Sequence, residues 1–322
     1  MKKILEINDL KVEFSFSGVK LTAVNMVRLN INESEIVGLV GESGSGKTMT
    51  ALSILNLIPY PGKIKSGNII FEGSMDLLKI KQKEMRYIRG KKISLIMQDP
   101  LSSLNPAFPI GWQITEIVKS SKLNYSKKEI FELIIKTLES VHMSNSKEVI
   151  HQYPHQLSGG MRQRVIIAMS IILNPLLILA DEPTTALDVT TQKEIFNLIE
   201  ELRTNNNKSF LIISHDLYLI GERCDRVYVM YAGQIVENTS SYELFNNPLH
   251  PYTINLLKST PSLIKNPERL EVITGEIPNL SNLPENGCFF QNRCNFVEDS
   301  CKKVMPELRI IPGNRMIRCH RV

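Results

Sequence analysis

The chain has 322 residues, of which 43% are hydrophobic and 22% charged, with a formal net charge of +5. This length and composition exclude wholesale disorder and predict about two domains. The longest apolar stretch, residues 165–180, is interrupted by Ser170, Asn174 and Pro175 and is shorter than the roughly 20 residues that a membrane-spanning helix needs. The N-terminal segment has no apolar run before Glu6, so we expect no secretory signal and a cytosolic chain.

Short apolar runs within residues 1–237 predict strands that alternate with helix-like segments. The runs are IVGLV (36–40), NIIF (68–71), ISLIM (93–97), LLILA (176–180), FLIIS (210–214) and RVYVMY (226–231). Such alternation predicts an α/β fold with a largely parallel sheet. Residues 112–165 lack strand runs, and residues 126–141 carry apolar residues at helical spacing. A helical insertion is therefore expected there.

The composition changes near residues 237–247. Prolines recur beyond this point and break long helices, and the cysteines crowd the region from residue 288 onward. We therefore expect a first domain over residues 1–237, with a helical subdomain over about 99–165. A small Pro- and Cys-rich extension over residues 238–322 would follow it.

The motif GESGSGKT (41–48) follows the predicted strand IVGLV and precedes a helix-like segment, as a phosphate-binding P-loop requires. Glycines let backbone N–H groups converge on phosphate oxygens, and the helix presents its partially positive N-terminus. We expect Lys47 to contact the β- and γ-phosphates and the hydroxyl of Thr48 to ligate Mg²⁺. The alternative is a Gly- and Ser-rich connector without a ligand. The expected ATP contacts are Gly41, Glu42, Ser43, Gly44, Ser45, Gly46, Lys47, Thr48 and Met49.

Two carboxylates follow the predicted strand LLILA in the segment LLILADEP. A P-loop needs a carboxylate at the end of a neighbouring strand to hold the metal, so we expect Asp181 to bind Mg²⁺. Glu182 is placed to orient or deprotonate the attacking water. The alternative is that both residues only cap a buried strand.

The segment LSGGMRQR (157–164) lies between these two motifs, and with it the chain resembles the ATP-binding cassette (ABC) ATPases. Ser158 is also a suitable N-cap for the following helix, and Gly159 and Gly160 leave N–H groups open to an anion. A well-capped helix without a ligand is the alternative. The resemblance implies that Ser158, Gly159 and Gly160 reach the γ-phosphate bound to an opposite subunit, so that ATP joins two cassettes.

The same resemblance implies roles for residues in other motifs. Gln98 in MQDP would sense the metal and contact a transport partner, and Asp188 in ALD would communicate across the dimer. His215 in IISHD would contact the γ-phosphate. Together with Glu182, Gln98 and His215 form the expected catalytic set of an active ATPase.

An aromatic residue near the end of the first strand-like segment completes the expected nucleotide site. Phe14 matches the residue that stacks on adenine in the family, and Phe16 is a rival for this role. The alternative is that either ring is part of the core.

The tail narrows the resemblance to one subfamily. The segments NPLHPYT (247–253), GEIPNL (275–280) and GCFFQNRC (287–294) resemble the ATPase subunits of oligopeptide and dipeptide importers, as do residues 60–73 and 98–106. The resemblance implies an ATPase that powers peptide import from the cytoplasmic face of the membrane. It also implies a second, different ATPase subunit, two membrane-spanning permease subunits and an extracellular solute-binding protein.

Other functions remain as alternatives to peptide import. Related importers carry nickel or sugars. A soluble cassette ATPase that acts on nucleic acid or ribosomes is a rival of a different class, but such proteins usually have two cassettes or a coiled-coil insertion. No nucleic-acid partner is therefore expected.

Cys288, Cys294, Cys301 and Cys319 cluster in the last part of the chain. In a reducing cytosol, clustered thiols favour a metal site over disulfides. Thiolates as the only ligands suit an iron–sulfur cluster or zinc, and the C-x₂₋₄-C pair typical of zinc is missing. Some members of the importer subfamily carry a [4Fe–4S] cluster on four such cysteines, so the resemblance implies a structural cluster here. Zinc and unliganded cysteines are the alternatives, and Cys224 is expected to be a small buried residue.

Overall fold

The computed structural model describes most of the chain and divides it into two compact units. The first unit comprises Met1–Ile80 and Ile212–Val322, and the second comprises Lys81–Leu211. The described residues are 2–16, 18–99, 103–185, 187–259, 275, 278 and 280–322. Parts of three motifs used above lie outside them, namely residues 100–102, residue 186, and residues 276, 277 and 279.

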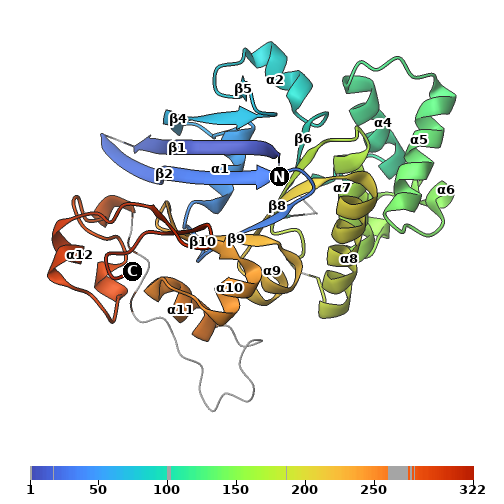
Figure 1. Cartoon of the computed structure of the whole chain (residues 1–322). Helices are drawn as coiled ribbons and strands as arrows, with labels where there is room; N and C mark the ends of the chain where they lie inside the picture. The colour runs from blue at the N-terminus through green and yellow to red at the C-terminus, as the bar shows by residue number, and fades with distance from the viewer. Residues whose placement is uncertain are drawn as a thin grey trace. The chain divides into compact units, whose positions relative to one another are not determined.

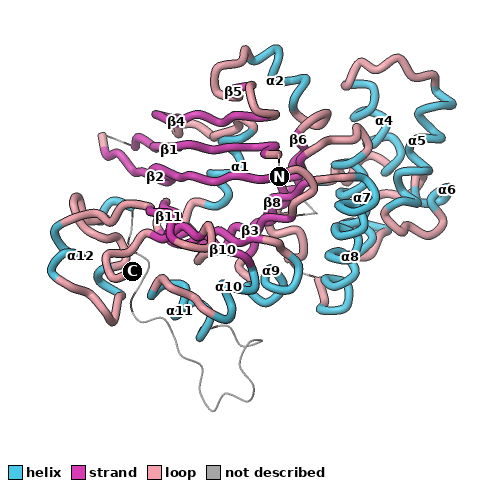
Figure 2. The backbone as a smooth tube through the Cα atoms, viewed as in Figure 1, coloured by secondary structure: helices cyan, strands magenta, loops and turns pink. Residues whose placement is uncertain are grey.

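Strands dominate the N-terminal part of the first unit, and short elements fill its C-terminal part (Figures 1 and 2). The N-terminal elements are β1 (Lys3–Phe16), β2 (Val19–Asn32), β3 (Ile36–Val40), α1 (Lys47–Ile54), β4 (Lys63–Phe71) and β5 (Met75–Asp76). The C-terminal elements are α9 (Leu217–Arg223), β9 (Arg226–Tyr231), β10 (Gln234–Ser240), α10 (Ser241–Asn246), α11 (Pro251–Lys258), η3 (Leu280–Asn282), η4 (Gln291–Arg293), α12 (Asp299–Lys303), β11 (Arg309–Ile311) and β12 (Arg315–Ile317).

One sheet of the first unit is antiparallel and has the strand order β2-β1-β4-β5 (Figure 1). Its central strand β1 pairs Leu5 with Ile31 of β2 and with Phe71 of β4. These three residues are fully buried, because directly paired residues of neighbouring strands point to the same face of the sheet. The largely parallel pattern expected from the apolar runs therefore does not extend to this sheet.

The other strands of the first unit follow the order β11-β12-β10-β9-β3. The pair β3 and β9 is parallel, and every residue of β3 is buried, as the continuous apolar run IVGLV predicts. The C-terminal strand β12 pairs antiparallel with β10 and places Ile317 opposite Glu237. The last strands of the chain thus extend the sheet that contains β3, the strand before the P-loop.

The second unit is mainly helical, and its two strands β6 and β7 pair in parallel. Its elements are α2 (Gln82–Ile88), β6 (Ile93–Ile96), α4 (Ile110–Ser120), α5 (Lys127–Ser140), α6 (Ser146–Val149), η1 (Pro154–Gln156), α7 (Gly159–Ile171), β7 (Leu177–Asp181) and α8 (Val189–Asn206). The chain passes into the first unit within β8 (Ser209–Ser214). Helices α4, α5 and α7 pack against one another (Figure 1).

The apolar runs of the sequence coincide with strands of the structure. IVGLV and RVYVMY are β3 and β9, and the remaining runs lie within or next to β4, β6, β7 and β8. The helix expected over residues 126–141 is α5, which begins with a capping box between Ser126 and Glu129. Cys224 is buried, as expected, with 7% of its surface exposed, and burial raises the pKa of its thiol.

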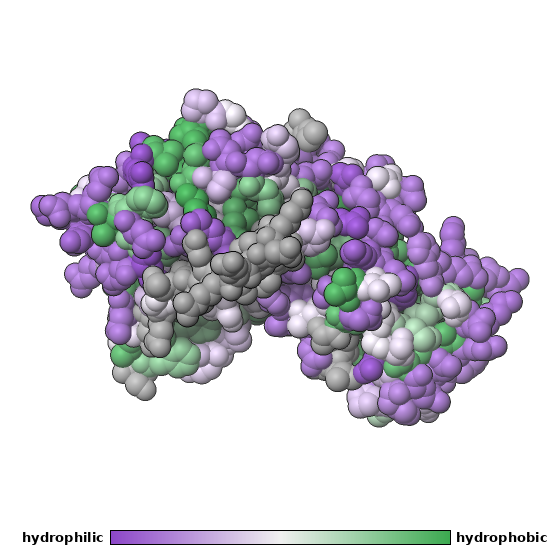
Figure 3. All heavy atoms as spheres, turned by 90° about the horizontal axis from the view of Figure 1, so that it is seen from below, coloured by the Kyte–Doolittle hydropathy of each residue, from purple (hydrophilic) through white to green (hydrophobic). Residues whose placement is uncertain are grey.

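Among the described residues, no helix combines the length and the apolar character that crossing a bilayer requires. On the face drawn in Figure 3, hydrophilic residues predominate and hydrophobic residues gather in separate patches.

Candidate nucleotide-binding and hydrolysis site

The P-loop between β3 and α1 has a backbone conformation that only glycine adopts readily. Gly41 has φ of 153° and Gly46 has φ of 105°. A Cβ atom on Gly41 would lie 2.1 Å from the carbonyl oxygen of Met230, and one on Gly46 would lie 2.4 Å from that of Ala23. Both positions therefore require glycine. The loop closes tightly and leads directly into the first turn of α1.

Lys47 lies inside this loop and is only 6% exposed. Its Nζ donates hydrogen bonds to the carbonyl oxygens of Gly41 and Glu42, at 2.8 and 2.9 Å. Thr48 follows it on the first turn of α1 and is half-buried, whereas Ser43 and Gly44 at the turn of the loop are exposed. The loop thus holds an ammonium group and a hydroxyl group beside exposed backbone, which suits an anionic ligand.

Phe14 and Phe16 lie near the end of β1 and stack on each other. Their ring centroids are 6.2 Å apart and the ring planes differ by 5°. Phe16 is 50% exposed, and Phe14 is half-buried. Phe16 is thus an exposed ring that stacks on the less exposed Phe14. The geometry does not distinguish between the two as the residue that stacks on adenine.

Asp181 and Glu182 stand at the end of β7 in the second unit, and their environments differ. Asp181 is only 3% exposed. Glu182 has φ of 48°, a conformation that is uncommon for residues other than glycine and that occurs often at functional sites. Its Oε2 accepts hydrogen bonds from Nε2 of Gln98 at 2.9 Å and from Oγ1 of Thr185 at 2.8 Å. The structure thus brings Gln98 and Glu182 together, and it adds Thr185, which no sequence motif indicates, as a second partner of Glu182.

Ser158 and Asp188 both cap helices of the second unit. The Ser158 side chain accepts a hydrogen bond from the Met161 N–H at 3.2 Å at the start of α7, which confirms the expected N-cap. Asp188 caps α8 by accepting bonds from the N–H and hydroxyl of Thr191 at 3.0 and 2.7 Å. The bond from the Thr191 side chain lowers the pKa of Asp188. Ser158, Gly159 and Asp188 are exposed, so a partner could reach them.

His215 follows β8 directly, in the first unit, and is exposed. The next residue, Asp216, caps α9 by accepting bonds from the N–H groups of Tyr218 and Leu219 at 3.0 and 3.2 Å. This cap fixes where the strand ends and the helix begins. His215 is therefore held at a defined turn beyond the carboxyl end of β8.

Two family models match the chain. The model described as ABC transporter matches residues 24–185, which include the P-loop, Gln98 and the pair Asp181–Glu182. The chain belongs to the ABC transporter family. A second model, described as the C-terminal region of oligopeptide/dipeptide transporters, matches residues 236–301.

Relatives and solved structures agree with this family. The oligopeptide transport ATP-binding protein AppD of Bacillus subtilis is 44% identical over 99% of this chain and 97% of its own length. The dipeptide transport ATP-binding protein DppD of Escherichia coli is 40% identical over 98% of this chain and 96% of its own. The dimeric ATP-binding cassette MJ0796, solved with ADP and phosphate, matches 74% of this chain and 98% of its own, with a TM-score of 0.66 and 25% identity. The chain is thus an ABC ATPase with the P-loop cassette fold.

Cys288, Cys294, Cys301 and Cys319 line one small cavity of about 20 Å³ together with Phe290. Burial raises the pKa of the Cys288 thiol to about 11 and also raises that of Cys294. Within the described ranges, no group of three His, Cys, Asp or Glu side chains is arranged to hold a single metal ion. The metal predicted from the sequence therefore stays a prediction.

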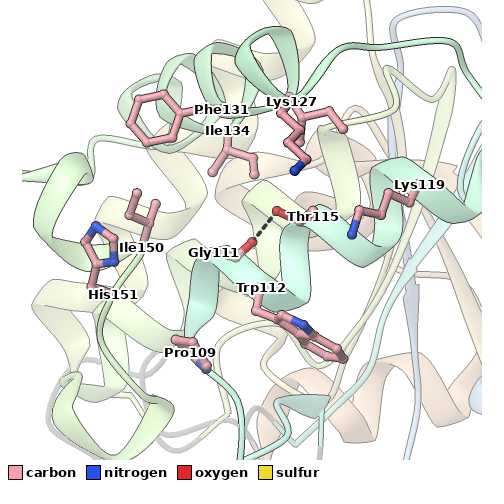
Figure 4. A pocket seen from close by; sticks show the side chains of 11 residues that line it. Pro109, Gly111, Trp112, Thr115, Lys119, Lys127, Phe131, Ile134, Ile150 and His151 are labelled. Atoms are coloured by element: carbon pink, nitrogen blue, oxygen red, sulfur yellow. Dashed lines mark hydrogen bonds between the residues drawn. The ribbon is translucent and has the colours of Figure 1, made fainter.

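A larger cavity lies in the helical part of the second unit, between α4 and α5 (Figure 4). Its volume is about 370 Å³. The side chains that open into it are mostly apolar, and three basic residues stand around it. The apolar lining includes Trp112, Ile130, Phe131, Ile134 and Ile150, and the basic residues are Lys119, Lys127 and His151. Such a lining suits a partner that is apolar and carries negative charge.

The structure also places Arg293, which lies between Cys288 and Cys294, in contact with the P-loop. Arg293 donates two hydrogen bonds to the carboxylate of Glu42. No motif of the sequence links Arg293 to the P-loop, because it stands 251 positions from Glu42 in the chain. In the sequence, only the position of Arg293 between Cys288 and Cys294 indicates that it could have a functional role.

Proposed function

We propose that this ABC ATPase hydrolyses ATP to ADP and phosphate in order to power the import of oligopeptides or dipeptides. The observation that carries the proposal is the match of residues 236–301 to the C-terminal region of oligopeptide/dipeptide transporters. Residues 1–237 would form the nucleotide-binding domain, with its helical subdomain over about 99–165, and residues 238–322 the extension. The chain would act at the cytoplasmic face of the membrane.

In the first unit, the P-loop binds the phosphates of ATP through its backbone N–H groups and Lys47. Hydrogen bonds to two loop carbonyls hold the ammonium of Lys47 within the loop that would surround the phosphates. Thr48 supplies a hydroxyl oxygen for Mg²⁺, and His215 contacts the γ-phosphate. Phe14, or its rival Phe16, stacks on adenine.

In the second unit, Glu182 acts as the general base for the attacking water. Hydrogen bonds from Gln98 and Thr185 orient its carboxylate, and a carboxylate so held can accept the proton of a water placed beside it. Asp181 supplies the oxygen ligand that Mg²⁺ prefers. Bound Mg²⁺ would neutralise charge that develops on the phosphate oxygens.

Ser158, Gly159 and Gly160 contact the γ-phosphate of ATP on a second cassette, and Asp188 carries the signal between the two cassettes. The exposure of Ser158, Gly159 and Asp188 and the capping of α7 support these roles, because a helix N-terminus attracts an anion. The second cassette is a related but different chain. Binding of ATP closes the pair, and hydrolysis reopens it.

The cavity between α4 and α5 receives a cytoplasmic segment of a permease subunit. An apolar side chain of that segment would fill the space beside Trp112 and Phe131, and a carboxylate would meet Lys119, Lys127 or His151. Two permease subunits and an extracellular solute-binding protein complete the importer. Peptide selection therefore belongs to those partners.

The four cysteines hold a [4Fe–4S] cluster, and zinc is the less favoured alternative. Four thiols with aromatic neighbours around one cavity match the all-thiolate ligand set of such clusters. Because burial raises the pKa of the Cys288 thiol to about 11, metal binding would release a proton from this thiol, and the free energy of binding would add to that of folding. Its role is structural.

Deletion of the gene for this chain is expected to abolish uptake of labelled di- and oligopeptides, with nickel uptake unchanged. Because this subunit supplies the energy of transport, uptake should return when the wild-type gene is restored. Rates of uptake measured with labelled peptides and with nickel in the same strains check this expectation. Nickel uptake that depends on the chain while peptide uptake does not would favour the nickel alternative. Copurification with ribosomes rather than with membrane subunits would support the soluble rival.

Replacing Cys301 and Cys319 with serine is expected to remove iron and sulfide from protein purified without oxygen. The serine hydroxyl does not replace a thiolate as a ligand for iron. Metal analysis, sulfide analysis and the visible absorption spectrum measure the loss. Cys224→Ala is the matched control, since Cys224 is buried elsewhere, and it should keep the iron. Stoichiometric zinc in the wild-type protein would reject the cluster.

A further inference from the structure

The P-loop has a buried ionic contact with the C-terminal cysteine segment, which we define as residues 287–301. Arg293 donates from Nη1 to Oε2 of Glu42 at 2.8 Å and from Nη2 to Oε1 at 2.9 Å. The Arg293 side chain is 4% exposed and that of Glu42 is 21% exposed. A bidentate pair of this kind fixes orientation as well as distance. Glu42, the second residue of the P-loop motif, is therefore held by a residue outside the matched cassette region.

An aromatic cluster supports both members of this pair. The ring of Tyr231 lies 5.7 Å from Cζ of Arg293 and contacts the ring of Phe290 edge-on, with centroids 5.2 Å apart. The hydroxyl of Tyr252 accepts a hydrogen bond from the N–H of Glu42 at 2.9 Å. Tyr231, Tyr252 and Phe290 are fully buried or nearly so. Backbone and side chain of Glu42 are thus both fixed from the C-terminal side of the chain.

The cysteine segment determines where Arg293 lies. Arg293 ends the short helix η4 and directly precedes Cys294. The Cys288 N–H donates to the carbonyl oxygen of Cys301 at 2.8 Å, and Phe290 lines the cavity together with the cysteines. Any change that unfolds the cysteine segment must also withdraw the guanidinium from Glu42.

We propose that Arg293 is a positioning residue of the nucleotide site, through which the cysteine segment sets the affinity of the P-loop for ATP. The inference rests on the proposed ATPase function. Glu42 is a carboxylate within a loop that must bind a polyanion, and like charges repel each other. Arg293 neutralises the charge of this carboxylate and fixes the orientation of the Glu42 side chain. Without Arg293, the uncompensated carboxylate of Glu42 repels the phosphates and ATP binding weakens.

Arg293→Met in the full-length chain is expected to weaken the binding of Mg²⁺–ATP by about tenfold. Equilibrium titration with a fluorescent ATP analogue, followed by competition with ATP, measures the affinity. Arg293→Lys should recover part of it, because the charge returns without the bidentate geometry. Adding Glu42→Gln to Arg293→Met should also recover affinity, because it removes the uncompensated charge. Recovery in this double variant distinguishes an electrostatic role from a structural one.

Arg315→Met is the matched control. Arg315 is another buried arginine of the C-terminal region, but it pairs with Glu237 and Glu243 rather than with the P-loop. This variant should lower the thermal unfolding temperature while leaving ATP affinity within about twofold. If Arg293→Met is not recovered folded, Arg293→Gln serves in its place, because it keeps a hydrogen-bond donor for Glu42 without the charge. It should bind ATP more weakly than the wild type, and Glu42→Gln/Arg293→Gln should bind ATP more tightly than Arg293→Gln.

The outcomes separate this inference from the proposed function. ATP affinity unchanged in Arg293→Met, or lowered equally in Arg315→Met, would contradict the positioning role and leave the ATPase function intact. A double variant that carries Glu42→Gln and binds ATP no more tightly than the corresponding single Arg293 variant would contradict the electrostatic role. No ATP binding by the wild-type chain would overturn the proposed function, and with it the inference that rests on it.

Discussion

Glu182→Gln is expected to lower the rate of ATP hydrolysis by about 1,000-fold, since a positioned general base contributes about 10²–10⁴-fold. Glutamine keeps the shape of the side chain and can still accept a hydrogen bond through its amide oxygen. It cannot take a proton from water. ATP binding should therefore persist, and the variant should accumulate as an ATP-bound species. Release of phosphate in steady state and nucleotide retained after gel filtration measure the two effects.

The control for this prediction is Glu201→Gln on α8. Glu201 pairs with His142 at 2.9 Å on the surface of the same unit, and its side chain is 47% exposed. Loss of the Glu201 charge should leave the rate of ATP hydrolysis unchanged, because an exposed ion pair contributes little to the stability of the fold. Hydrolysis by Glu182→Gln at the wild-type rate would exclude Glu182 as the base. Gln98 and His215 would then be the remaining residues of the expected catalytic set.

Lys47→Met is expected to weaken ATP binding by at least about 100-fold, which corresponds to about 2.8 kcal/mol. Methionine retains most of the aliphatic side chain but has no charge to offer the phosphates. The structure adds a reason for a large effect: the ammonium also donates to two carbonyl oxygens within the loop, so its loss removes contacts that shape the P-loop. Nucleotide titration and the shift of unfolding temperature on adding Mg²⁺–ATP measure the change.

The matched control is Lys65→Met on β4, an exposed lysine of the same unit. It should bind ATP like the wild type. Wild-type affinity in Lys47→Met would mean that the loop binds phosphate through its backbone alone, and the assigned role of Lys47 would be wrong.

Local patterns in the sequence predicted much of the fold and of the candidate site. The buried strands β3 and β9 coincide with IVGLV and RVYVMY, because a strand covered on both faces needs a continuous apolar run. The P-loop was predictable because the glycines that its tight turn requires stand at fixed spacing in the chain. The caps at Ser126 and Ser158 likewise depend on residues three positions apart.

The antiparallel sheet of β1, β2 and β4 was harder to predict. Its strands pair residues far apart in the chain, such as Leu5 with Phe71. Polar residues alternate with apolar ones along β1, so no continuous apolar run marks it. Its pairing partners follow from register, which a single strand does not specify.

The sequence by itself thus determined which chemical groups the protein carries: a phosphate-binding loop, a pair of carboxylates after a strand and four clustered thiols. Only the tertiary structure decided which of these groups meet. It brings Gln98 to Glu182 across 84 positions and Arg293 to Glu42 across 251. Motifs and periodicity describe neighbours along the chain, whereas these contacts depend on how distant segments pack.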